Sequence, residues 1–233
     1  MPDRALISRT SPAGNYLAGR FAFAPSNRDM AAAAIYYRAA LRADPKNEDL
    51  LERTFISTLA QGAVDEAAPL AERLIVLDRN QRISRLALGA RALKKAQYKQ
   101  ARTYLSPAIR GPVADLTATL MLAWALAGNN QAQAGVAPIS QLQGPDWYAA
   151  FKDLHIGMIL DYAGNRAQAG TRLAAAYRYD PTSVRTLDAY ARWLSRNGKI
   201  DEAKKVYNDF AKVLPHHPLV DQALDELNAG KQL

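Results

Sequence analysis

Small residues recur at intervals of thirty-four positions, and this period constrains the fold of the chain more than any other feature. The positions that share it are Ala33, Ala67, Ala101, Gly135, Ala169 and Ala203. Four positions later the chain is always apolar, at Tyr37, Ala71, Leu105, Ile139, Leu173 and Tyr207. A small residue lets two helix backbones approach, and an apolar side chain one turn later fills the groove beside it. The period therefore predicts a helix pair that is repeated along the chain.

Two further sets of positions with the same period predict the ends of these helices, and a third predicts where the two helices of a pair approach. Five residues before the small residues stand Arg28, Gly62, Ala96, Asn130, Gly164 and Gly198. Four of these six are glycine or asparagine, which tolerate the left-handed backbone of a tight turn. Twelve residues before lie Phe21, Phe55, Gly89, Ala123, Gly157 and Ala191, and the four small residues among them let the first helix of a pair approach the second. Twelve residues after lie the helix-ending prolines Pro45, Pro181 and Pro215. Strand patterns are nearly absent, so each unit is predicted to be a pair of antiparallel helices.

The pattern resembles the tetratricopeptide repeat family in an alanine-rich, bacterial-type form. The residues that carry the resemblance are Leu88, Gly89, Ala101 and Leu105 in the third unit, Gly157, Gly164, Ala169, Ala176 and Pro181 in the fifth, and Tyr190, Ala191, Gly198, Ala203, Tyr207 and Pro215 in the sixth. Two units depart from the family pattern. Phe21 and Pro25 disturb the first helix of unit one, which is expected to be shortened or displaced, and Pro138 falls inside the second helix of unit four.

The expected architecture is an all-α, right-handed α-solenoid of about six antiparallel helix pairs, in which stacking of the units builds one continuous core. Residues 1–11 are expected to be a flexible segment. The repeat array is expected over 12–215, with units at 12–46, 47–80, 81–112, 113–144, 145–181 and 182–215. Residues 216–233 have Leu219, Val220, Ala223, Leu224 and Leu227 at helical spacing and are expected to form a C-terminal capping helix.

Composition excludes several classes of protein. No stretch of about 18 uninterrupted apolar residues exists, so no membrane-spanning helix is expected. The N-terminus lacks the apolar core of a secretory signal, which predicts a cytoplasmic protein, or one of the cell envelope if the chain is a fragment of a longer exported protein. The absence of cysteine excludes disulfides and thiolate metal sites.

No constellation of residues indicates catalysis. The three histidines are His155, His216 and His217, and Asp153 lies two positions from His155, where a helix points the two side chains to different faces. Nucleotide-binding, metalloprotease and serine-hydrolase motifs are absent. We therefore expect no catalytic residues, no cofactor and no metal, and a non-enzymatic protein.

The resemblance implies that the first helix of each unit lines a concave groove, where members of the family often bind peptides. The predicted groove residues are Leu86, Ala90, Leu93, Leu120, Trp124, Leu154, Met158 and Tyr162, with Arg192 and Arg196 toward one end. Such an apolar and aromatic surface suits a protein or peptide partner. Alternatively, several of these residues, notably Leu93 and Trp124, pack between units. Trp147 and Tyr148 are expected to be wedges between units, and the clamp that some relatives use for a terminal carboxylate is not supported.

The net charge of +8 is concentrated in the third unit. Nine basic residues and no acidic residue lie between Arg79 and Ala114. Those proposed as an anion-binding patch are Arg82, Arg85, Arg91, Lys94, Lys95, Lys99 and Arg102. The function favoured is thus a scaffold or adaptor for protein partners. The alternative is a module that binds an acidic protein segment, an anionic lipid or, less favoured because few aromatic residues are interleaved, nucleic acid. The basic residues can also simply be solvated, and homo-oligomerisation is left open.

Overall fold

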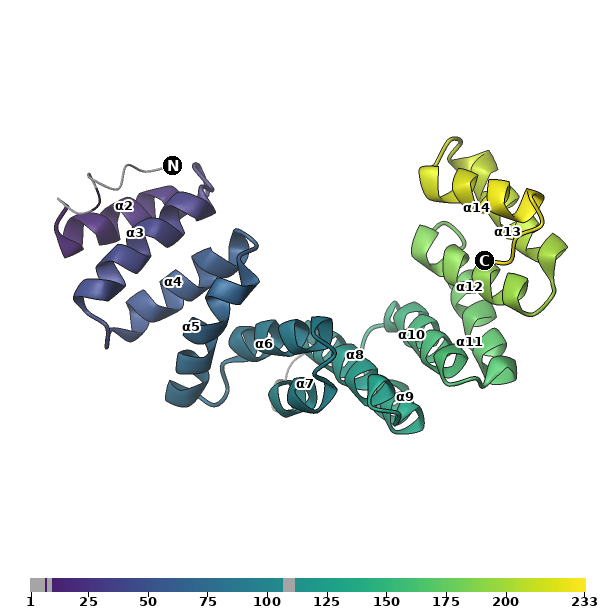
Figure 1. Ribbon diagram of the computed structural model, residues 1–233, viewed down its shortest axis with the longest axis horizontal. Helices are drawn as coiled ribbons and strands as arrows, with labels where there is room; N and C mark the ends of the chain where they lie inside the picture. The colour runs from purple at the N-terminus through teal and green to yellow at the C-terminus, as the bar shows by residue number, and fades with distance from the viewer. Residues whose placement is uncertain (1–6, 8–9, 107–111) are drawn as a thin grey trace. The chain divides into compact units, whose positions relative to one another are not determined.

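The computed structural model describes residue 7 and residues 10–106 and 112–233, and within these ranges it contains thirteen α-helices and no strand (Figure 1). The chain forms two compact units, Met1–Ala114 and Asp115–Leu233. The helices are α2 (Pro12–Phe23), α3 (Met30–Ala43), α4 (Glu48–Ala60), α5 (Val64–Leu77), α6 (Arg82–Lys94), α7 (Tyr98–Leu105), α8 (Pro112–Gly128), α9 (Ala132–Gln141), α10 (Tyr148–Tyr162), α11 (Arg166–Tyr179), α12 (Val184–Arg196), α13 (Ile200–Val213) and α14 (Pro218–Asn228). The predicted all-α helical-repeat fold is confirmed. Most of the predicted flexible segment 1–11, Arg110 and the boundary at 112–113 lie outside the residues whose side chains are described.

The turn inside each helix pair has the left-handed backbone that the period predicts. Positive φ angles occur at all six positions: Arg28 (49°), Gly62 (87°), Ala96 (55°), Asn130 (60°), Gly164 (80°) and Gly198 (78°). Arg28 and Ala96 adopt this conformation although their residue types disfavour it. Their place in the repeat therefore overrides their local preference.

The core lies where the two main sets of repeated positions predict it. The six small residues from Ala33 to Ala203 and the six apolar residues from Tyr37 to Tyr207 are all buried. A Cβ atom added at Gly89 would lie 2.5 Å from the Leu105 side chain, and one at Gly157 would lie 2.7 Å from the Leu173 side chain. At Gly135 an added Cβ would meet the carbonyl oxygen of Ala123 at 2.6 Å. These small residues thus permit the close approach of the two helices in each pair.

Helix α2 is displaced along the first pair, which is one of the two outcomes that Phe21 and Pro25 predict. Phe21 is 73% exposed, and Gly19 instead approaches Tyr37, because a Cβ at Gly19 would lie 2.8 Å from the Tyr37 ring. Gly19 and Tyr37 are two residues farther apart in sequence than Gly89 and Leu105. The longer connection from Ala24 to Asp29 accommodates these two residues while the packing is kept.

The irregular fourth pair and the C-terminal segment are also helical. Pro138 lies inside the ten-residue helix α9, and Ile139 beside it is fully buried. Helix α14 buries Val220, Ala223 and Leu227 in the cluster that contains Tyr207 and Phe210 of α13. The role of α14 as a cap and the predicted unit boundaries stay predictions.

Candidate functional site

The first helix of each pair leaves one side free of the core. On each of five helices, four residues at positions i, i+4, i+7 and i+11 are half-buried or exposed, and they recur with the period of the chain. This spacing places them on one side of an α-helix. We call them the first-helix face: Asp49, Arg53, Ile56 and Ala60 on α4; Ile83, Ala87, Ala90 and Lys94 on α6; Thr117, Met121, Trp124 and Gly128 on α8; Phe151, His155, Met158 and Tyr162 on α10; Arg185, Ala189, Arg192 and Arg196 on α12.

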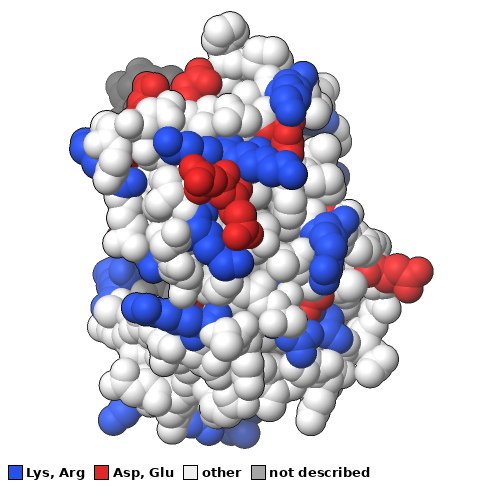
Figure 2. Space-filling view, turned by 90° about the vertical axis from the view of Figure 1, so that its right-hand side faces the viewer, with Lys and Arg blue, Asp and Glu red and all other residues white. Residues whose placement is uncertain are grey.

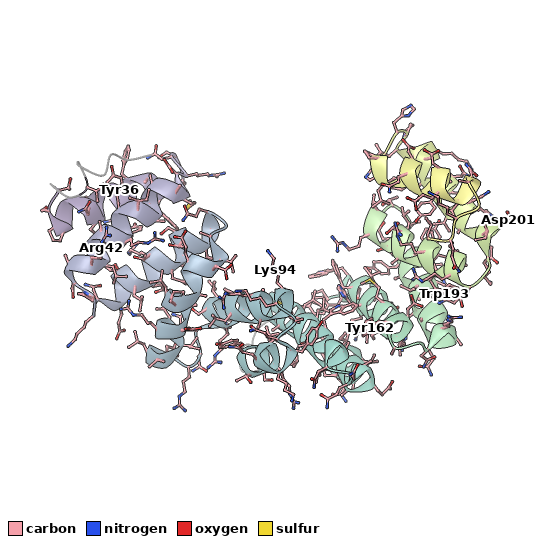
Figure 3. All side chains as sticks on the ribbon, in the orientation of Figure 1. Tyr36, Arg42, Lys94, Tyr162, Trp193 and Asp201 are labelled. Atoms are coloured by element: carbon pink, nitrogen blue, oxygen red, sulfur yellow. The ribbon has the colours of Figure 1, made fainter. Side chains whose placement is uncertain are left out.

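Helix α10 carries the most aromatic part of this face. Phe151 is 44% exposed and Tyr162, at the C-terminal end of the helix, is 64% exposed (Figure 3). The ring of Trp147, itself 42% exposed, stands edge-on to Phe151 with the ring centroids 5.7 Å apart. Met158 is half-buried between Phe151 and Tyr162 along the helix. Large apolar side chains therefore remain accessible to a ligand along more than two turns of α10.

A hydrogen bond joins α10 to α8 within this face. The Trp124 indole Nε1 donates to His155 Nδ1 at 2.9 Å, and the two rings meet edge to face. Burial, with a smaller contribution from the positive charge of Arg185, lowers the pKa of His155 to about 4. The imidazole is therefore neutral at pH 7, with its proton on Nε2, because Nδ1 accepts the bond from Trp124.

Helix α12 supplies arginines to the same unit. The Nε of Arg192 donates to both carboxylate oxygens of Asp188 at 3.0 Å, and the Tyr207 hydroxyl donates to Asp188 Oδ1 at 2.7 Å. Arg196 forms an ion pair with Asp161 of α10 at 2.5 Å. Among the described residues, Arg185 has no carboxylate within ion-pair distance. The second unit thus presents an apolar surface on α10 and one unneutralised guanidinium on α12.

The predicted groove residues divide into three groups. Leu120 and Leu154 are buried in core clusters, so for these two the alternative of packing holds and they are not available to a ligand. Leu86, Leu93, Trp124 and Met158 are half-buried, as is Arg192, whereas Ala90, Tyr162 and Arg196 are exposed. Of the two residues expected to be wedges between units, Tyr148 is buried, whereas Trp147 is 42% exposed.

Sequence reasoning missed several residues of the first-helix face. Met121, Phe151, His155 and Arg185 were not predicted, because the groove was traced through Leu86, Leu120 and Leu154. These leucines have the right period, but Leu120 and Leu154 are buried in the core and Leu86 is half-buried. The missed signal was the spacing Phe151, His155, Met158 and Tyr162, which places large side chains on one side of a helix.

The basic residues of the third unit do not share one face. Arg91 and Lys95 both contact Oδ1 of Asp65 on α5, at 2.6 and 3.1 Å. Their hydrogen bonds, that of Arg91 first, hold the pKa of Asp65 below its usual range. Arg85 donates through Nε to the carbonyl oxygen of Arg79 at 2.7 Å.

The other four patch residues, Arg82, Lys94, Lys99 and Arg102, are exposed on two different helices. Lys94 extends away from α6 and is part of the first-helix face (Figure 3). On the side of the molecule shown in Figure 2, basic side chains are likewise spread out, with acidic ones among them. The charge of the third unit is thus partly neutralised and is distributed over several surfaces.

Other candidate sites offer little chemistry. A cleft of about 530 Å³ in the second unit is lined by α9, α10 and α11, but three of its charged side chains have partners within the protein. Lys152 donates to the carbonyl oxygens of Ser140 and Leu142, and Arg172 pairs with Asp153 at 2.8 Å. Within the described ranges no group of three histidine, aspartate or glutamate residues could hold a metal ion. In the same ranges no helix combines the length and apolarity needed to cross a bilayer.

Stacked helix pairs with a repeated core define an all-α helical-repeat solenoid. A tetratricopeptide repeat protein from Parabacteroides merdae is similar over 93% of this chain and 84% of its own, with a TM-score of 0.61 and 13% identity. A chain of the APC/C hetero-tetramer Cut9–Hcn1 matches 96% of this chain with a TM-score of 0.60 and 13% identity. This chain spans only 44% of that one.

The protein YrrB, a tetratricopeptide repeat protein with an unusual peptide-binding site, matches 80% of this chain and 96% of its own, with a TM-score of 0.54 and 15% identity. No family model and no curated protein matches the sequence. The protein has the tetratricopeptide repeat fold, as the sequence predicts.

Proposed function

We propose that this protein is a non-enzymatic scaffold or adaptor that binds a protein partner through the first-helix face of its second unit. The observation that carries the proposal is the accessible stripe of Phe151, Met158 and Tyr162 on α10. Aromatic side chains that stay exposed in a row, rather than singly, are typical of interaction surfaces.

The energetics favour a partner over a purely structural role for this stripe. Tyr162 and Phe151 keep much of their surface in water, although the cores on both sides of α10 are closely packed. Covering apolar surface contributes roughly 25 cal/mol per Å². Two or three such side chains can therefore serve as the anchors of a protein interface. The shared fold also supports the proposal, since tetratricopeptide repeats generally serve as scaffolds for protein interactions.

Substitution of the stripe tests the proposal. Partners are captured from the native cell with the full chain and with the variants Phe151→Arg and Tyr162→Arg. The control is Tyr179→Arg, a comparably exposed tyrosine at the end of α11 and outside the first-helix face. We expect a partner that is retained by the control and lost by both stripe variants. Equal retention by all chains would refute the proposal.

Salt separates this function from the alternative of anion binding through the third unit. At about 0.5 M NaCl exposed charges interact weakly, whereas apolar contacts persist. A partner held by the stripe should therefore survive the higher salt. Binding that falls steeply with salt, and that is lost when Lys94 and Lys99 are changed to glutamine, would favour anion binding instead.

A further inference from the structure

We infer that the segment bound by the second unit is an acidic amphipathic peptide, whose apolar side chains cover the α10 stripe and whose carboxylate pairs with Arg185. This inference rests on the proposed function and adds the chemistry of the partner. It starts from the difference between Arg185 and the two other arginines of the α12 face.

Arg192 and Arg196 already have carboxylates within the protein. Asp188 binds Arg192 and Asp161 binds Arg196, and the side chains of these two aspartates are mostly buried. Arg185 is exposed on the same side of α12, and the structure places no described carboxylate beside it. Of the three guanidiniums, Arg185 is therefore the one with its charge available to a ligand.

Arg185 lies close enough to the stripe to act together with it. Arg185 on α12 and Phe151 on α10 hold equivalent positions in consecutive repeats. Helix α12 lies against α10, since the two helices are in contact and Arg196 of α12 pairs with Asp161 of α10. A peptide lying on Phe151 and Met158 can therefore place a carboxylate against Arg185. A planar guanidinium suits this role because it can donate two parallel hydrogen bonds to a carboxylate.

Charge complementarity favours an acidic peptide over the other ligands. The α10 stripe has no charged residue, and the charged residues of the first-helix face on α12 are all arginines. A basic peptide would be repelled by Arg185. A nucleic acid would bring one phosphate per nucleotide, and Asp161 and Asp188 already occupy the cations that its backbone would need. One available cation beside an apolar stripe fits a segment with few negative charges and several apolar anchors.

The anchors of such a segment follow from the spacing of the stripe. Phe151, Met158 and Tyr162 are separated by seven and four residues, or about 10 Å and about 6 Å along the helix axis. A partner helix along α10 would present apolar residues at the same spacing.

The experiment uses a displayed library of random peptides of roughly 14 residues, long enough to span about 21 Å as a helix. Peptides are selected on the full chain, and those that no longer bind Phe151→Arg are sequenced. We expect these peptides to be enriched in aspartate and glutamate as well as in apolar residues. A selected peptide should lose at least about tenfold in affinity on Arg185→Glu, which is about 1.4 kcal/mol. Arg178→Glu, the same charge change at an exposed arginine of α11, should leave its affinity unchanged.

A charge exchange completes the test. Replacing the acidic residues of the selected peptide by lysine should abolish binding to the natural chain and restore binding to Arg185→Glu. If stripe-dependent peptides show no excess of acidic residues, or if Arg185→Glu has no effect, the inference is wrong and the proposed function stands. If no selected peptide depends on Phe151, or if single-stranded oligothymidylate binds the stripe more tightly than every peptide, both the inference and the proposed function are wrong.

Discussion

Helices α6 and α10 occupy equivalent places in two repeats and show how differently the two sides of one helix are constrained. Their inner sides match, because Gly89 meets Leu105 and Gly157 meets Leu173 with nearly the same close approach. Their outer sides differ at every position. Ile83, Ala87, Ala90 and Lys94 on α6 correspond to Phe151, His155, Met158 and Tyr162 on α10.

This difference separates the residues that make the fold from those that can make a partner site. The inner positions must be small or apolar because two helices meet there. The outer positions are free of that requirement, and only on α10 are all four large. The repeat therefore identifies the scaffold, and the departures from uniformity on its outer side identify the candidate site.

The largest expected change in stability tests whether the inner sides of α6 and α10 are equivalent. Leu105 and Leu173 are both fully buried, so Leu105→Ala and Leu173→Ala should each cost about 2–5 kcal/mol in the free energy of unfolding. Because each repeat contacts mainly its neighbours, the loss should appear locally in hydrogen exchange, in α6 and α7 for Leu105 and in α10 and α11 for Leu173. Arg102→Ala and Arg178→Ala, at exposed positions of α7 and α11, are the matched controls. If either leucine substitution left the free energy of unfolding unchanged, the inner sides of α6 and α10 would not be equivalent.

A smaller change in the free energy of unfolding is expected on the outer side of α10, where His155 stands in place of Ala87 on α6. The pKa of His155 is about 4 in the folded chain and about 6.5 when unfolded, so between these values the unfolded state binds more protons. His155 therefore contributes stability that is complete above about pH 6.5 and is lost as the pH falls toward 4, by up to roughly 3 kcal/mol.

The measurement is urea unfolding of the natural chain and of His155→Gln between pH 4 and 7. The natural chain should lose more stability than the variant on acidification, with the additional loss confined to the second unit. Parallel pH curves for the two chains would contradict the buried, neutral state of this histidine.

The sequence was sufficient to predict the fold because the packing of helix pairs repeats. The two main sets of repeated positions are buried, and even Arg28 and Ala96, whose residue types argue against a left-handed turn, adopt it where the period requires. The displacement of the first pair was also predictable from Phe21. The contact of Gly19 with Tyr37 could not be predicted, because it depends on how the connection after α2 accommodates two further residues.

The candidate site was predicted less well, for a physical reason. Periodicity shows which residues of the repeats are equivalent. When a helix has two apolar sides, however, periodicity does not show which side packs in the core and which side is open to a ligand. Leu120 and Leu154 satisfy the period as well as Phe151 does, and only the packing of neighbouring helices shows that they are buried. The partners of Arg192 and Arg196 likewise depend on the side-chain geometry of Asp188 and Asp161 rather than on sequence spacing.

The smallest expected change in stability comes from giving α6 the outer side of α10. The double variant Ala90→Met and Lys94→Tyr alters only exposed positions, so its free energy of unfolding should differ by no more than about 0.5 kcal/mol. Binding should respond more, because the variant has two new apolar anchors beside Ile83, which is 51% exposed. A peptide selected on the α10 stripe should then bind at a second, weaker site, which calorimetry would detect as a rise in stoichiometry. Weaker binding is expected because α6 keeps Ile83 and Ala87 where α10 has Phe151 and His155. A large loss of stability would instead mean that the outer side of α6 is packed, and that the two helices differ in structure as well as in surface.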